Sequence, residues 1–180
     1  MTSNGRAKIE KTFNGINIII PSKKNWFALL FGIVWLGGWF AGILSALEEI
    51  FSSTSNSVPI FFLVFWLIGW TMVGLGLTAM LLWGYFGQER FITYRNEVFF
   101  EKIVFGEGKK DRLNASEIKN FRTEPVSYGW FNGGQAFWGL GAGKIKFDYG
   151  LKTYSFGLAV DDAEATYIVK LLKEQFNDNM

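Results

Sequence analysis

Two long apolar stretches without charged residues dominate the middle of the chain, over residues 25–47 and 58–87. An α-helix rises ~1.5 Å per residue, so about 20 residues cross the ~30 Å hydrocarbon layer of a membrane. A small soluble domain cannot readily bury two helices that are apolar all round, and a signal peptide would be shorter and closer to the N-terminus. The pattern therefore predicts two transmembrane helices, at about 26–47 and 58–87, joined by a short Ser-rich loop.

On both sides of the apolar stretches, polar and apolar residues alternate as they do in β-strands. Asn14 and Gly15 join two such runs, which predicts an N-terminal β-hairpin within residues 1–24. A lone hairpin is marginally stable in water, so we expect it to pack against the C-terminal sheet or the membrane surface. Six further strands are predicted at 90–95, 98–105, 109–113, 118–124, 144–148 and 152–156.

An amphipathic helix is predicted after the last strand. Asp161 and Asp162 provide N-terminal capping residues, and apolar residues recur on one helical face over 163–176. The predicted fold class is a membrane protein with a two-helix transmembrane hairpin and a cytoplasmic β-rich domain, residues 88–180, closed by this C-terminal amphipathic helix.

Two segments carry a resemblance to a known family. They are Gly-Gln-Glu-Arg-Phe-Ile at 87–92 and KIKFDYGLKTYSFGLAVDDAEATYIVKLL at 144–172. Together with the two spans and the meander that follows them, they resemble uncharacterised bacterial two-span membrane proteins with a pleckstrin-homology-like (bacterial PH) cytoplasmic domain. The resemblance implies a PH-like fold for residues 88–180. It carries over no functional residue, because these families share no activity.

The distribution of Lys and Arg predicts the orientation of the spans. Residues 1–25 contain five basic residues and one acid, whereas the loop between the spans is preceded by Glu48 and Glu49. Basic segments stay on the cytoplasmic side of a membrane. We therefore expect a multi-pass protein of the bacterial inner membrane with both termini in the cytoplasm.

The composition excludes several chemistries. The 180 residues include no Cys and no His, so zinc sites built on these ligands, Cys nucleophiles and triads with an imidazole base are absent. No ionisable residue lies within the apolar stretches, which disfavours a transporter, and the net charge of +2 disfavours a nucleic-acid partner. The glycine-rich segment 139–144 departs from phosphate-binding motifs, since Ile145 follows Lys144 where Ser or Thr is required. We expect a protein that is not an enzyme and has no cofactor and no metal.

Small residues form a stripe on the first predicted span, at Gly38, Gly42 and Ala46. Helices approach closely at such stripes. Gly74 and Thr78 offer a matching face on the second span, which favours an intramolecular hairpin. The alternative is that the stripe docks another protein.

Four tryptophans lie deeper in the spans than residues of the aromatic belt at the membrane surface: Trp35, Trp39, Trp66 and Trp70. An indole N–H prefers a hydrogen-bond partner. These side chains are predicted to pack on each other, on another subunit or on a lipid-soluble cofactor.

A long glycine-rich loop carries further aromatic residues, Trp130, Phe131, Phe137 and Trp138. Long loops of this kind are usually functional. Three interpretations stay open: the loop enters the cytoplasmic leaflet, it contacts a partner protein, or its rings fold onto their own domain.

The function that these features favour is a non-catalytic accessory or assembly subunit of a larger inner-membrane complex. Its expected partners are other membrane protein subunits and membrane lipids, with a homodimer as another mode of assembly. The alternative is a self-standing, membrane-anchored lipid-binding or regulatory module.

Overall fold

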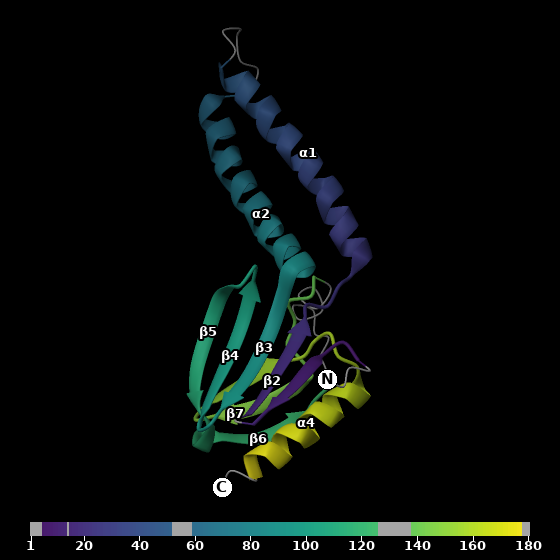
Figure 1. The fold of residues 1–180 in the computed structure, drawn as a ribbon. Coiled ribbons are helices and arrows are strands. Elements are labelled where there is room, and N and C mark those ends of the chain that lie inside the picture. The colour runs from purple at the N-terminus through teal and green to yellow at the C-terminus, as the bar shows by residue number, and fades with distance from the viewer. Residues whose placement is uncertain (1–4, 14, 52–58, 126–137, 178–180) are drawn as a thin grey trace. The chain divides into compact units, whose positions relative to one another are not determined.

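The computed structural model describes residues 5–13, 15–51, 59–125 and 138–177, and the chain divides into two compact units. One unit is Trp26–Leu82 and consists of helices. The other combines Met1–Asn25 with Trp83–Met180 and contains the strands (Figure 1). The N-terminal hairpin, expected to pack against the C-terminal sheet or the membrane surface, is thus part of the β unit, where residues 17–21 pair with residues 88–92.

The helices are α1, Trp26–Phe51, and α2, Ile60–Phe86. Both are long and apolar enough to cross a membrane. The helix α1 extends beyond the predicted end at residue 47, because Glu48 and Glu49 favour helix and continue it past the apolar stretch. Most apolar side chains of both helices are exposed, with Phe61 79% and Phe65 77% accessible.

The first sheet is an antiparallel meander in the order β1-β2-β3-β4-β5. Its strands are β1 Lys8–Thr12, β2 Gly15–Pro21, β3 Gly87–Tyr94, β4 Glu97–Val104 and β5 Glu107–Asn114. The strands β2 and β3 pair directly, with Pro21 opposite Gln88, although both helices lie between them in the sequence. The chain therefore leaves this sheet at the end of β2 and rejoins it on the neighbouring strand.

The second sheet has the order β6-β7-β8 and is also antiparallel. A 3-10 turn, Ala115–Glu117, leads into β6 Ile118–Thr123, which is followed by β7 Ile145–Tyr149 and β8 Lys152–Phe156. The helix α4, Asp162–Asn177, packs against β6. The six predicted C-terminal strands and the C-terminal helix are confirmed, with small shifts of their ends.

The core of the β unit is rich in phenylalanine. Phe91 of β3 stacks on Phe156 of β8 with ring centroids 5.4 Å apart, and Phe147 of β7 meets Phe91 edge-on at 5.6 Å. The helix α4 adds Ile168 and Leu172, which are fully buried. Burial of each such side chain contributes about 1.5–3 kcal/mol, so this contact between the sheets and the helix stabilises the unit.

A buried carboxylate and a second acidic side chain fasten distant segments of the β unit together. Glu89 of β3 accepts a hydrogen bond from the Gly157 N–H at 2.7 Å and forms an ion pair with Lys102 at 3.1 Å. Glu164 of α4 accepts a hydrogen bond from the Ala7 N–H at 2.8 Å. These contacts connect the first sheet to the segment before α4 and connect the N-terminus to α4 itself.

Candidate functional site

The four deep tryptophans come together between the two helices. The Trp39 Nε1–H donates to the Trp70 carbonyl oxygen at 2.8 Å, and the Trp70 Nε1–H donates to the Trp39 carbonyl oxygen at 3.2 Å. Trp66 stacks on Trp70 with centroids 4.9 Å apart, and Trp35 lies 5.4 Å from Trp70. In apolar surroundings an unpaired N–H is costly, so these reciprocal bonds satisfy the indoles of Trp39 and Trp70 within the chain.

The small residues of α1 differ in what they meet. Gly42 faces Trp70, with a Cβ position 3.4 Å from the indole Nε1, and Ala46 is buried. Gly38 is exposed, and no atom lies within 4 Å of its Cβ position. The closest approach involves α2 instead, where a Cβ on Gly74 would lie 1.9 Å from Trp39 Cε2.

Of the predicted aromatic loop, Trp130, Phe131 and Phe137 lie outside the described residues, and Trp138 is half-buried. The next residue, Gly139, has φ +75° and a Cβ position 2.5 Å from the Lys23 carbonyl oxygen. Its own carbonyl oxygen accepts a hydrogen bond from Trp83 Nε1 at 2.9 Å. The glycine-rich segment therefore allows close packing beside the two connections to the helices.

Those two connections are held side by side within the β unit. The Ser22 Oγ–H donates to the Gly84 carbonyl oxygen at 2.9 Å, and the Ser22 N–H donates to the Gly87 carbonyl oxygen at 2.9 Å. Ser22 follows β2, and Gly84 belongs to the last turn of α2. The point where the chain enters α1 and the point where it returns from α2 are thus fixed together.

A cavity of about 410 Å³ lies at this place, and we call it the junction pocket. Its lining combines two cations, Lys24 and Arg90, with three aromatic rings, Tyr85, Phe86 and Phe105. Among the residues that the structure describes, no acidic side chain lines it. A basic pocket bordered by aromatic rings suits an anionic group attached to an apolar body.

Arg90 has unused hydrogen-bonding capacity in the junction pocket. Its Nε is buried without a hydrogen-bond partner, and its Nη2 makes one long bond of 3.4 Å to Gln88 Oε1. Glu101 lies opposite Arg90 in the strand register, but within the described chain the two form no ion pair. A guanidinium presents several donors in one plane and binds phosphate oxygens in pairs, so an anion in the pocket would satisfy the buried Nε.

Phe105 is held in a strained conformation at the edge of this pocket. It lies in the turn between β4 and β5 with φ 53°, a left-handed backbone that bulky side chains rarely adopt. Its ring lies 4.3 Å from that of Phe86, and the two side chains are 67% and 48% exposed. Residues with a strained backbone cluster at functional sites, where contact with a ligand or a surface can offset the strain.

In the sequence, Lys24 contributes only to the predicted orientation of the two spans in the membrane, and neither Arg90 nor Phe105 was predicted as a site residue. A signal for Phe105 was present, because Phe105-Gly106 occupies a hairpin turn where Asn-Gly or Asp-Gly is usual. Arg90 could be placed beside Lys24 only with knowledge of the β2–β3 pairing. No family model and no curated protein matches the chain.

Proposed function

We propose that the protein is a membrane-anchored, non-catalytic lipid-binding module of the bacterial inner membrane. Its β unit is a PH-like domain on the cytoplasmic side, and the junction pocket binds the headgroup of an anionic phospholipid. The observation that carries the proposal is that Lys24 and Arg90 line one pocket beside the two connections to the helices, and that the buried Nε of Arg90 has no hydrogen-bond partner.

Membrane insertion is supported by the helices themselves. They expose apolar side chains that a soluble protein would bury, and few residues of either helix are buried in the described structure. The basic segment before α1 supports cytoplasmic termini by the positive-inside rule. With this orientation, Lys24 and the end of α2 lie at the level of cytoplasmic lipid headgroups.

The PH-like interpretation of the β unit is supported by its order of elements. Two antiparallel sheets are followed by a single C-terminal helix that packs on the second sheet. The helices are inserted between β2 and β3, so this proposal makes the membrane hairpin an insertion within the domain. An experimental structure with a different strand order would contradict it.

The alternative of an accessory subunit stays a prediction. That prediction depended in part on the four deep tryptophans and the small-residue stripe of α1, both of which could contact another subunit. In the structure the indoles of Trp39 and Trp70 bond across the helix pair, and Gly42 faces Trp70. The geometry therefore favours lipid binding, and a fixed companion protein that co-purifies in mild detergent would favour the subunit.

The test is native mass spectrometry of the full chain in detergent with added phosphatidylglycerol or phosphatidylcholine. We expect selective retention of phosphatidylglycerol, with a loss of about tenfold in affinity on Arg90→Gln, because a hydrogen-bonded charge contributes about 1.5–3 kcal/mol. Lys11→Gln is the matched control, since Lys11 is exposed on β1 and lies outside the pocket lining.

A further experiment distinguishes binding of the whole lipid from binding of its headgroup alone. Free glycerol phosphate should compete weakly, because it lacks the acyl chains that Phe86 and Phe105 would contact. Equal retention of both phospholipids, or equal effects of Arg90→Gln and Lys11→Gln, would count against the proposal.

A further inference from the structure

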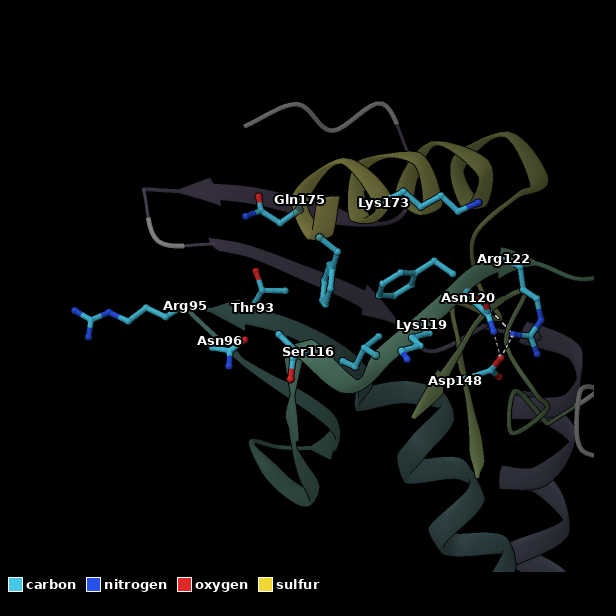
Figure 2. Close-up of a pocket in the computed structure, with 14 residues that line it drawn as sticks. Thr93, Arg95, Asn96, Ser116, Lys119, Asn120, Arg122, Asp148, Lys173 and Gln175 are labelled. Atoms are coloured by element: carbon cyan, nitrogen blue, oxygen red, sulfur yellow. Dashed lines mark hydrogen bonds and ion pairs between the residues drawn. The ribbon is translucent and has the colours of Figure 1, made fainter. Parts of the chain in front are cut away.

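A second, larger cavity lies at the other end of β3. Its volume is about 820 Å³, and it lies between β6, the last turns of α4 and the turn that joins β3 to β4 (Figure 2). We call it the distal pocket. The junction pocket involves Gly87 to Arg90 of β3, whereas the distal pocket involves Thr93 and the Arg95-Asn96 turn.

The distal pocket has an excess of cations. Arg95, Lys119 and Lys173 line it, and within the described chain none of the three forms an ion pair. Asp148 is the one acidic residue among the described lining, and it is occupied by Arg122 at 2.9 Å. Hydrogen bonds from Thr153, Asn120 and Arg122 lower the pKa of Asp148, which keeps this carboxylate ionised and paired. Three cations remain for a ligand.

The cations are spread along the pocket and do not converge on one point. In Figure 2, Arg95 points outward at one end, Lys119 lies in the middle, and Lys173 extends along α4 toward the other end. A compact phosphate would need converging donors. Separated cations match acidic groups that are spaced along an extended chain.

The floor of the pocket is apolar and its walls carry amides. Ile118 and Phe121 of β6 and Phe176 of α4 line it, with the two phenyl rings 4.9 Å apart. Asn96 and Gln175 add side-chain amides to the walls, and Asn120 adds one whose N–H donates to Asp148 at 3.1 Å. Apolar floor, amide walls and a cationic rim together suit a peptide in which acidic and apolar residues alternate.

The strand β6 lies at the edge of its sheet, and its pairing with β7 is interrupted by a bulge between Lys119 and Arg122. Asn120 within the bulge has φ 55°. A bulge discourages continuous strand addition at an edge. Side-chain contacts, more than a backbone ladder, are therefore expected to hold the ligand.

We propose that the distal pocket binds an extended acidic segment of a partner protein, with its carboxylates on Arg95, Lys119 and Lys173 and its apolar side chains on the floor of the pocket. This site is separate from the proposed lipid site. It would give a membrane-anchored module a means of recruiting a protein.

The test uses the full chain in nanodiscs of phosphatidylcholine and a pool of fluorescent peptides of about ten residues that alternate Glu or Asp with Leu or Phe. A matched pool carries Gln and Asn in place of the acids. We expect the acidic pool to bind, to be weakened by salt and to lose at least about tenfold in affinity on the double substitution Lys119→Glu/Lys173→Glu.

The control is Lys8→Glu/Lys11→Glu on β1, which changes the net charge equally and lies outside the pocket lining. Thermal unfolding of each variant separates a binding effect from a folding defect, and Arg95→Gln supplies a third variant if the double substitution fails to fold. The proposal is overturned if the acidic pool does not bind, if the neutral pool binds equally, or if both double substitutions have the same effect. It is also overturned if inorganic triphosphate or vesicles of phosphatidylglycerol bind through Lys119 and Lys173 while the peptides do not.

Discussion

Strained residues coincide with the pockets. Within the described chain, the non-glycine residues with a left-handed backbone are Arg95, Phe105 and Asn120, and each lines either the distal or the junction pocket. This backbone costs about 1–2 kcal/mol for most L-residues, whereas Asn tolerates it. The chain has Arg95 and Phe105 at turns where Asn would be easier to accommodate, which is consistent with use of their side chains.

Phe105→Asn should therefore separate stability from binding. We expect the free energy of unfolding to rise by about 1 kcal/mol, because Asn relieves the strain, while retention of phosphatidylglycerol falls with loss of the ring. Thermal unfolding and native mass spectrometry measure the two effects. Leu151→Asn, at a fully exposed turn residue, is the control and should change neither strongly. Higher stability with unchanged lipid retention would exclude Phe105 from the site.

At the level of elements, the alternation and the apolar runs were sufficient to predict both helices, the N-terminal hairpin and the later strands. The same patterns could not predict the pockets. The junction pocket needs Lys24, Arg90 and Phe105 from separate segments, which come together only through the β2–β3 and β3–β4 registers. The alternation of polar and apolar residues identifies a strand but does not say which strand it pairs with. A pocket formed by several paired strands therefore cannot be predicted from this alternation.

The helix pair depends on the fit of Trp39 against Gly74. Gly74→Ala should weaken the pair, because its new Cβ would lie 1.9 Å from Trp39 Cε2. Gly76→Ala is a matched control on the same helix, since nothing lies within 4 Å of its Cβ position and Ala favours helix. Thermal unfolding in detergent should show a lower midpoint for Gly74→Ala and an equal or higher one for Gly76→Ala. Equal midpoints for the two variants would contradict the observed packing.

The second sheet should be sensitive to acid. Hydrogen bonds from Thr153, Asn120 and Arg122 lower the pKa of Asp148, and bonds from Lys146 and Arg122 lower the pKa of Glu124. A carboxylate with a lowered pKa stabilises the fold above its unfolded-state pKa, and this contribution is lost as the pH falls through the folded-state pKa. The loss should therefore begin near pH 4 and grow below it.

Unfolding midpoints measured from about pH 6 to about pH 2.5 check this expectation. Asp148→Asn should flatten the acid side of the curve. Glu107→Gln, at an exposed position of β5, should leave it unchanged. An acid side that is equally steep in wild type and Asp148→Asn would show that the Asp148 network does not contribute.

For the whole molecule, the absence of Cys makes the proposed orientation easy to test. Single cysteines at Lys152, in β8, and at Asn56, between the two helices, introduce the only thiols of the chain. In intact cells we expect a membrane-impermeant maleimide to label Asn56→Cys and to label Lys152→Cys only after lysis. The reverse result would overturn cytoplasmic termini.

The pairing of β2 with β3 also has a consequence for biogenesis. Residues 15–21 are synthesised before either helix, and their partner strand follows both of them. If the helices cross a membrane, insertion of only one would leave β2 and β3 on opposite faces, and the central part of the first sheet could not assemble. In that case a chain with a single inserted helix could not complete the first sheet, so assembly of the β unit would require the two helices to insert as a pair.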